Sequence, residues 1–263
     1  MDNFCKIMND VSPLWGVCSF AEFSDHLIDC RSKSYIPDGT KSVIVALFPY
    51  YLGEDAYEGS NISRYAVVPD YNDFMKYRLD RASEKLKEFY PSEEFVAFCG
   101  NSPFPEVSLA QRAGLGSKGR NGLLLTEKYG SWVFIGEIAT TAYIEPSDNT
   151  LNLCDGCDLC IRNCPTGALF HGGFDPDLCL SAITQKKKPL TAEQEDLIKS
   201  VGCAWGCDIC QKSCPKNKGA QRTEIEEFLN GVKLCAEYGD DLTDRAYGWR
   251  GAKVIERNLD LLK

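Results

Sequence analysis

Two groups of cysteines stand out in this sequence because of their number and their spacing. Residues 154–165 read C-x2-C-x2-C-x3-C-P, and residues 207–215 read C-x2-C-x3-C-P. The first pattern is the bacterial arrangement for a cubane iron–sulfur cluster, with three thiolates on one cluster and the fourth on its neighbour. A single C-x2-C pair would fit zinc or a redox disulfide equally well. Two cubanes need eight thiolates, and the two runs with one nearby cysteine supply eight, so the sequence predicts two 4Fe–4S clusters.

The spacing assigns seven of the eight ligands. In paired-cluster proteins the last cysteine of each run crosses over to the other cluster. This groups the cysteines as Cys154, Cys157, Cys160 and Cys214 for the first cluster and Cys164, Cys207 and Cys210 for the second. An unbroken repeat would place a further cysteine at position 204, which is Ala204. Cys179 and Cys203 both remain candidates for the last place, and spacing alone does not choose between them.

The N-terminal sequence, the apolar runs and the cysteine pattern together predict the cellular compartment of the protein. The N-terminus, MDNFCKIMNDV, lacks the basic and apolar regions of a signal peptide. No apolar run approaches the roughly 20 residues of a transmembrane helix. Fourteen cysteines that cluster in such a chain indicate metal ligands in a reducing, cytoplasmic compartment rather than disulfides.

The charge balance bears on possible partners. The net charge of −9 argues against a surface built mainly for nucleic-acid phosphates. A local basic patch could still form from the lysines at positions 186–188, 212, 216 and 218. We interpret these lysines as part of an ordinary solvated face.

The first 150 residues carry alternating helix and strand signals. The continuous apolar run 41–48 predicts a buried strand, and residues 95–98 predict a second, shorter one. Residues 72–90 have the apolar spacing of an amphipathic helix, and 105–113 form a short helix that ends at Gly114. We expect strands at 122–126 and 131–138 to form a hairpin around a turn at 127–130. These elements predict an α+β domain with an antiparallel or mixed sheet.

The second half contains short elements around the cysteines. Thr191–Gln194 is a capping box that opens a short helix between the two cysteine groups. Residues 222–238 have the spacing of a further amphipathic helix. A glycine-rich loop, Ala113–Asn121, precedes this half and matches neither common nucleotide-binding fingerprint. Its glycines would let the backbone approach a large polar ligand, and an ordinary tight turn explains them equally well.

Taken together, these pieces resemble the epoxyqueuosine reductase family over about residues 35–258. The landmarks are short motifs spread along the chain: Lys41–Val45, Pro49-Tyr50, Arg64–Ala66, Asp70-Tyr71, Ala113–Gly116, Gly119–Asn121, Gly130–Trp132, Gly136-Glu137, Cys164–Leu169, Gly206–Asp208 and Arg257-Asn258.

The resemblance implies a fold and a division into domains. The expected fold is a nitroreductase-like, cobalamin-binding α/β sandwich followed by a bacterial two-cluster ferredoxin-like domain. The corresponding boundaries are 1–149 for the cobalamin-binding domain, 150–220 for the double 4Fe–4S domain, and 221–263 for a C-terminal helical segment that packs back on the core. The family pattern also places a cysteine where Cys179 stands, which favours Cys179 over Cys203 as the last cluster ligand.

The resemblance also implies the chemistry. Family members bind cobalamin base-off without a protein ligand to cobalt, and neither His26 nor His171 lies in a D-x-H-x-x-G ligand motif here. The clusters pass electrons from a low-potential donor such as flavodoxin or ferredoxin to the cobalamin, which removes the oxygen of an epoxide in the last step of queuosine synthesis on tRNA. Cofactor contacts are expected from Arg64, Tyr65, Gly114, Gly116, Lys118, Arg120 and Asn121.

Three departures from the family pattern concern the substrate and the proton donor. The family's proton-donating aspartate falls at Gly100 or Asn101, which leaves Cys99, Asn101 and Glu106 as the catalytic candidates. The family's loop lysine is Arg120, which keeps the charge but loses the compact geometry. The chain ends at Lys263 without the helical-repeat extension of longer members, and this with the acidic charge weakens the expectation of a tRNA partner. The alternative interpretation is a two-cluster electron-transfer protein without cobalamin chemistry.

Overall fold

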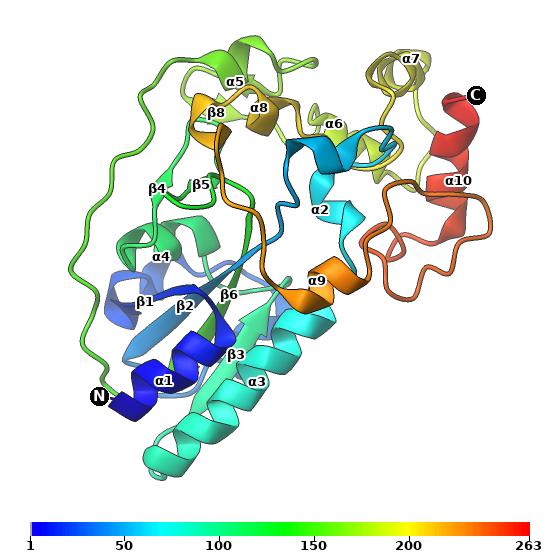
Figure 1. Cartoon of the computed structure of the whole chain (residues 1–263). Coiled ribbons are helices and arrows are strands. Elements are labelled where there is room, and N and C mark those ends of the chain that lie inside the picture. The colour runs from blue at the N-terminus through cyan, green and yellow to red at the C-terminus, as the bar shows by residue number, and fades with distance from the viewer. Residues whose placement is uncertain (1) are drawn as a thin grey trace.

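A four-stranded antiparallel sheet forms the centre of the first half of the chain. The structure is a computed structural model that describes residues 2–263, with side chains from residue 3 onward. The strands lie in the order β1 (Leu14–Ser19), β2 (Ser42–Pro49), β6 (Val133–Thr140) and β3 (Phe95–Cys99), and each neighbouring pair is antiparallel. Figure 1 shows this sheet with its helices in the lower part of the molecule and the cysteine-rich region at the top. The predicted α+β class with an antiparallel sheet is confirmed.

Helices cover both faces of the sheet. Alternate β2 residues Ile44, Ala46 and Phe48 join a core with α1 (Asp2–Val11) and α3 (Tyr71–Phe89). The intervening residues Val43, Val45 and Leu47 pack instead with α4 (Glu106–Arg112). Since successive side chains of a strand point to opposite faces, a strand covered on both sides is apolar throughout. This explains why β2 is a continuous apolar run, with all eight residues buried.

Several predicted elements lie within one residue of the expected bounds. The strands predicted at 41–48 and 95–98 are β2 and β3, and the helices predicted at 72–90 and 105–113 are α3 and α4. Gly114 follows α4 with a φ of 77°, as its role in ending that helix requires. The capping box is present at the start of α7 (Ala192–Val201), where the Thr191 hydroxyl accepts from the Gln194 N–H.

Two predicted elements are wrong. The segments at 122–126 and 131–138 do not form a hairpin, because β5 (Leu124–Leu125) pairs with β4 (Ser117–Lys118) in a separate small sheet. β6 instead lies between β2 and β3, and only an isolated bridge joins Thr126 to Gly130. The helix predicted over 222–238 shrinks to α9 (Glu226–Asn230). Arg245 donates to the Gly231 carbonyl, so tertiary contacts rather than helix continuation satisfy this backbone.

The cysteine-rich region consists of short elements joined by turns. Its helices are α5 (Leu159–Arg162), α6 (Leu180–Thr184), α7 and α8 (Ile209–Lys212), and β7 (Leu169–Phe170) with β8 (Gly173–Phe174) forms a two-residue hairpin. The remaining elements are α2 (Arg64–Val67), α10 (Ala252–Leu261) and five 3-10 turns at Phe20–Glu22, Ser24–His26, Arg31–Tyr35, Glu54–Tyr57 and Pro215–Asn217. In Figure 1 a long segment after β6 runs along the outside of the molecule to α5.

Buried polar side chains join the cysteine-rich region to the rest of the protein. On α10, the Asn258 amide is fully buried and donates to the carbonyls of Thr184 and Ala204, both at 2.7 Å. Across the other boundary, Asn217 accepts from the Ser131 N–H and donates to the Ser131 hydroxyl. The Gln211 amide also donates to Ser131.

Nothing in the described helices is long and apolar enough to span a bilayer.

Candidate functional site

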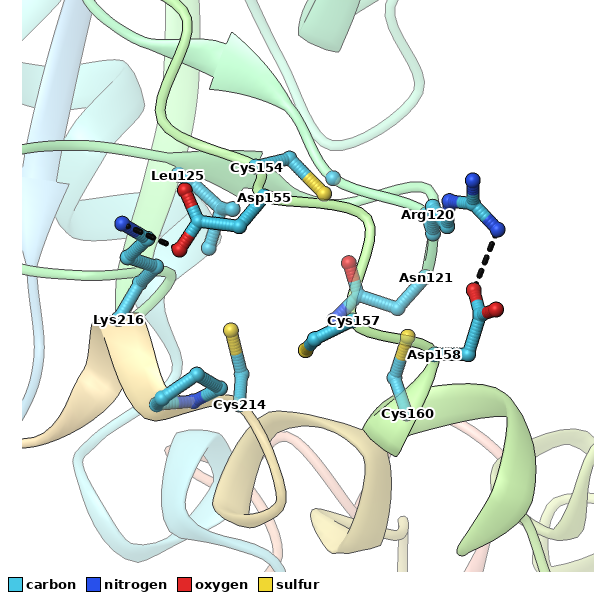
Figure 2. A pocket seen from close by; sticks show the side chains of 12 residues that line it. Arg120, Asn121, Leu125, Cys154, Asp155, Cys157, Asp158, Cys160, Cys214 and Lys216 are labelled. Atoms are coloured by element: carbon cyan, nitrogen blue, oxygen red, sulfur yellow. Dashed lines mark hydrogen bonds and ion pairs between the residues drawn. The ribbon is translucent and has the colours of Figure 1, made fainter.

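Four cysteines from two parts of the chain converge in a pocket between the β4–β5 segment and the cysteine-rich region. Cys154 and Cys157 lie in the segment before α5, Cys160 lies in α5 itself, and Cys214 follows α8. Figure 2 shows their sulfur atoms facing a common space. Cys157 is exposed and the other three are half-buried, so this group lies close to the protein surface.

Charged residues flank the opening of this first pocket. Lys216 pairs with Asp155 at 2.8 Å, and Arg120 pairs with Asp158 on the opposite side (Figure 2). Both acids lie inside the Cys154–Cys160 run, so these pairs hold the cysteine turn against the neighbouring loops. Exposed ion pairs of this kind contribute little stability individually, about 0–1 kcal/mol each.

A second group of four cysteines lines a separate and larger cavity of about 390 Å³. It contains Cys164, Cys179, Cys207 and Cys210. Burial raises the pKa of Cys207 to about 11 and that of Cys210 to about 12. Thiols in such surroundings become thiolates only beside a strong positive charge, such as that of a metal. Cys203 does not line this cavity, because its thiol donates to the carbonyls of Trp205 and Gly206.

Aromatic rings line part of the larger cavity. Tyr71 stacks on Phe134 with a centroid distance of 3.9 Å, and Tyr50 lies 4.4 Å from the same ring. Tyr65 contributes a further edge, and Ser131, Gln211 and Asn121 add polar groups. A mostly apolar cavity with a few polar groups is the usual character of a cofactor or ligand site.

Two tyrosine hydroxyl groups that line this cavity accept hydrogen bonds from neighbouring side chains, which orient them. The indole N–H of Trp205 donates to the Tyr65 hydroxyl at 2.8 Å, and the Gln211 amide donates to the Tyr50 hydroxyl at 3.3 Å. Neither partner can accept at that nitrogen. Each tyrosine oxygen therefore uses a lone pair toward the protein and keeps its own proton for another acceptor.

Arg64 lies beside this site but not in its wall. Its side chain is about 5% exposed, and its guanidinium lies over the rings of Tyr51, Tyr57 and Trp132 at 5.4, 4.7 and 4.7 Å. The guanidinium pairs with Glu54, and the backbone N–H donates to Asp208 in the second cysteine run. The three rings do not line the cavity, so Arg64 is joined to the cavity wall through Asp208, which stands between the lining residues Cys207 and Ile209.

The glycine-rich loop is held mainly by contacts within the protein. A Cβ at Gly114 would lie 2.8 Å from Asn149, and one at Gly116 would lie 2.2 Å from the Leu125 carbonyl oxygen. These glycines thus permit close packing of one chain segment on another, and they do not line the larger cavity. Lys118 is exposed, and Arg120 borders the first cysteine pocket. Of the seven residues expected to contact the cofactor, Tyr65 and Asn121 line the larger cavity.

The three catalytic candidates lie near the end of β3, outside the cavity wall. Asn101 is exposed and both its carbonyl and its side chain contact the Ser32 hydroxyl. Cys99 is half-buried, and burial followed by the charge of Glu137 raises its pKa to about 12, which makes it a poor acid. Burial raises the pKa of Glu106 to about 7. Glu106 is therefore the only one of the three that titrates near neutral pH.

Gly100, one of the two positions where the family's aspartate falls, disfavours a larger residue in this structure. Gly100 has a φ of 73°, and a Cβ there would lie 2.3 Å from Oδ1 of Asn72. Such a backbone conformation favours glycine, and the contact is closer than any real packing. Gly100 therefore carries no side chain that could donate a proton.

A buried carboxyl group behind this loop was missed by the sequence prediction. Glu137 on β6 is fully buried; one of its oxygens accepts from the Ser102 hydroxyl at 3.1 Å, and the other has no partner among the described residues. Burial, reinforced by the charge of Glu106, raises the pKa of Glu137 well above its usual range. In the sequence, Glu137 was marked only as part of the Gly136-Glu137 landmark and as a polar residue amid the apolar 131–138 run, and neither sign indicated a chemical role.

The cysteine groups fit iron–sulfur clusters better than single ions. Within residues 2–263 no three His, Cys, Asp or Glu side chains converge as a single ion requires. Four sulfurs spread around an open pocket suit a larger multi-iron group, and the donor set of four thiolates is the one such clusters use. The aromatic cavity beside the second group, with its two free hydroxyl protons, likewise fits an organic cofactor that carries hydrogen-bond acceptors.

Comparisons with known proteins agree with this geometry. Residues 153–217 match the family model described as 4Fe-4S double cluster binding domain, and residues 32–99 match the model described as Epoxyqueuosine reductase QueG, DUF1730. An epoxyqueuosine reductase of Listeria monocytogenes is 32% identical over 72% of this chain and 53% of its own length. One of Gloeobacter violaceus is 35% identical over 86% of this chain and 75% of its own length. The chain thus spans from about half to three quarters of these two relatives.

Solved structures show the same fold. A selenomethionine-labelled epoxyqueuosine reductase superposes with a TM-score of 0.84 at 23% identity, covering 99% of this chain and 80% of that one. An epoxyqueuosine reductase with an epoxyqueuosine-modified tRNA-Tyr stem loop gives 0.82 at 22% identity, with the same coverage. A catabolic reductive dehalogenase shares the fold more distantly, with a TM-score of 0.51 at 14% identity over 95% of this chain and 34% of that one. On the sequence relationships, the chain belongs to the epoxyqueuosine reductase family.

Proposed function

We propose that this protein is an iron–sulfur and cobalamin-dependent reductase that removes the oxygen of an epoxide. The observation that carries the proposal is the gathering of eight cysteines into two groups of four, the second of which opens onto an aromatic cavity. This arrangement suits a short electron path that ends at a bound cofactor.

The cluster ligands follow from these groups. Cys154, Cys157, Cys160 and Cys214 would hold the first cluster, and Cys164, Cys179, Cys207 and Cys210 the second. Cys179 is the proposed fourth ligand that spacing left open, because it lines the cavity with the other three cysteines. The Cys203 thiol instead donates hydrogen bonds to backbone carbonyls. Electrons from an external low-potential carrier would enter at the first cluster, because Cys157 is exposed there, and leave through the second beside the cavity.

The larger cavity is the proposed cobalamin site. Tyr65, Tyr71 and Phe134 offer flat surfaces for a corrin, and the hydroxyls of Tyr50 and Tyr65 offer protons to its polar groups. Cobalamin supplies low-potential electron transfer and nucleophilic cobalt chemistry when it is bound. Of the residues expected at this site, Arg64 would act by bracing the wall, and the glycine loop by carrying Asn121.

The domain boundaries follow the same division. Residues 1–149 would form the cobalamin-binding domain of nitroreductase-like type, with helices on both faces of its sheet. Residues 150–220 would hold the two clusters. Residues 221–263 would close the structure, since Asn258 of the last helix is bonded to the carbonyls of Thr184 and Ala204.

Glu106 is the proposed donor of one of the two protons that the reaction consumes. Reduction of an epoxide to an alkene takes two electrons and two protons, because the oxygen must be protonated twice to depart as water, and the second proton would come from solvent. A general acid works best with a pKa close to the working pH. Glu106, with its pKa raised to about 7, meets this condition, and its charge acts on the buried carboxyl of Glu137. Because Glu106 does not line the cavity, its proton would have to reach the substrate through a relay. Cys99 would remain protonated, and Asn101 has no acidic proton to give.

Epoxyqueuosine in tRNA is the proposed substrate, and the cytoplasm the proposed location. The family membership supports the substrate, and a structural relative has been solved with an epoxyqueuosine-modified tRNA stem loop. A tRNA would have to approach an acidic protein, with a net charge of −9.

Anaerobic reconstitution tests the cofactor content. We expect about eight iron and eight sulfide per chain, and then binding of one cobalamin with spectral changes on reduction. Loading of both clusters without any cobalamin binding would instead support the two-cluster electron-transfer protein. About four iron per chain would contradict the assignment of two cubanes.

A further inference from the structure

The side chain of Asn121 lies at the boundary between the two cysteine groups. It lines the first pocket, with Cys154 and Cys157, and also the larger cavity that contains the second group. Figure 2 shows the side chain extending from its loop into the space between the cysteine sulfurs of the first group. Few side chains of the protein reach both sites.

The amide nitrogen of Asn121 is buried without a hydrogen-bond partner. Among residues 2–263 no acceptor lies within reach of Nδ2. A buried N–H without an acceptor is costly, and folded proteins rarely leave one unsatisfied. The unpaired nitrogen therefore points to an acceptor that is not part of the polypeptide.

The loop fixes which end of the amide faces the pockets. The Gly119 N–H donates to the Leu123 carbonyl, and the Gly122 N–H donates to the Gly119 carbonyl, so the turn that carries Asn121 is closed. Oδ1 of Asn121 accepts from the Leu123 N–H at 3.3 Å. A Cβ at Gly119 would lie 2.7 Å from that same oxygen, so glycine is needed for the amide to fold over the turn. With Oδ1 held by its own loop, Nδ2 must face outward.

We propose that Asn121 donates a hydrogen bond to a sulfur atom of the first cluster, the one held by Cys154, Cys157, Cys160 and Cys214. This inference rests on the proposed presence of two clusters. Sulfur atoms of a cluster become more negative on reduction, so an N–H donor stabilises the reduced form and raises the reduction potential. Asn121 thereby sets the potential of the cluster at which electrons enter relative to that of the second cluster.

A matched pair of asparagine variants tests this role. Asn121→Leu replaces the unpaired amide with an apolar group of the same branched shape. Asn163→Leu is the control, since Asn163 lies next to the ligand Cys164 but its amide already donates to the Leu159 carbonyl. Both variants and the wild type are loaded with iron and sulfide, without cobalamin, and each is titrated by redox potentiometry with EPR detection.

We expect one of the two cluster potentials to shift to a more negative value in Asn121→Leu, with the other unchanged. Neither potential should shift in Asn163→Leu. In a Cys179→Ser background, which should retain only the first cluster, the Asn121→Leu shift should persist. Unchanged potentials in a fully loaded Asn121→Leu protein would overturn the inference, and so would equal shifts of both clusters or a shift of the second alone.

A measurement on the unmodified side chain covers the case in which the variant fails to load. Pulsed EPR of wild type with nitrogen-15 in the asparagine side chains should detect a coupling between a reduced cluster and an amide nitrogen, retained in Asn163→Leu. Absence of this coupling in the loaded wild type would also overturn the inference. A wild-type protein that holds fewer than two clusters would instead contradict the proposed function itself, so the two failures are distinguishable.

Discussion

The Trp205 indole donates a hydrogen bond of 2.8 Å to the hydroxyl of Tyr65 and thereby orients that hydroxyl at the cavity wall. Trp205 is fully buried and precedes the second cysteine run by two residues, whereas Tyr65 comes from α2 in the first half of the chain. Because an indole N–H can only donate, the proton of Tyr65 remains available to a bound molecule. A contact between the two halves of the protein thus prepares the cavity.

Replacement of Tyr65 by phenylalanine should weaken cobalamin binding without affecting the clusters. Loss of one hydrogen bond costs about 1 kcal/mol, or roughly fivefold in the dissociation constant. Calorimetric titration of the iron-loaded protein with cobalamin measures the change. Tyr77→Phe is the control, because Tyr77 is 65% exposed on α3 and lines no part of the cavity. Equal affinity of Tyr65→Phe and wild type would show that the hydroxyl does not contact the cofactor.

Cys179→Ser should lower the iron content of the protein, whereas Cys203→Ser should leave it unchanged. Cys179→Ser removes a proposed ligand and should lower iron from about eight to about four per chain. Cys203→Ser changes a thiol that bonds only to backbone carbonyls and should leave iron unchanged. Iron and sulfide analysis after anaerobic loading shows which of the two cysteines is the ligand. The reverse pattern would transfer the ligand role to Cys203.

The raised pKa of Glu106 should appear as a pH dependence of stability. A carboxyl whose pKa rises from 4.5 to about 7 on folding binds more protons in the folded than in the unfolded state between these values. Its contribution is then lost as pH rises from 4.5 to 7 and is constant above. Thermal unfolding at several pH values should show that Glu106→Gln reduces this decline. A decline of unchanged steepness in the variant would place the titration elsewhere.

The stacked guanidinium of Arg64 should not be replaceable by lysine. Arg64→Lys keeps the charge but loses the planar contact with three rings, and we expect a destabilisation of about 2 kcal/mol. Arg112→Lys is the matched control, because Arg112 is exposed and paired with Glu22. This substitution should lower the free energy of unfolding by less than about 0.5 kcal/mol. Denaturant unfolding of both variants measures the difference. Similar effects at the two positions would mean that the rings contribute nothing specific.

The part of the site that depends on local spacing could be predicted from the sequence. The C-x2-C runs and their trailing prolines indicated which cysteines belong together, because cluster ligation imposes its own spacing. The capping box at Thr191 and the apolar period of α3 likewise depend on residues within a few positions of one another. In each of these patterns, the residues that interact also lie close together in the sequence.

The remainder depends on contacts between distant residues. β6 reads as the second strand of a hairpin, yet its partners β2 and β3 lie far away in the chain. The larger cavity joins Tyr50, Tyr65 and Phe134 to cysteines more than a hundred residues later in some cases. Glu137 was missed because only the fold shows that its strand position is fully buried. Sequence periodicity cannot supply these long-range pairings.

Conversion of epoxyqueuosine to queuosine in tRNA is the measurement that tests the central claim most directly. The protein is loaded anaerobically with iron, sulfide and cobalamin, reduced with a low-potential donor, and incubated with tRNA that carries epoxyqueuosine. We predict formation of queuosine that depends on added cobalamin and is abolished in Cys207→Ser. Absence of queuosine from a protein that has two reducible clusters and bound cobalamin, beside an active control enzyme, would contradict the proposed reaction.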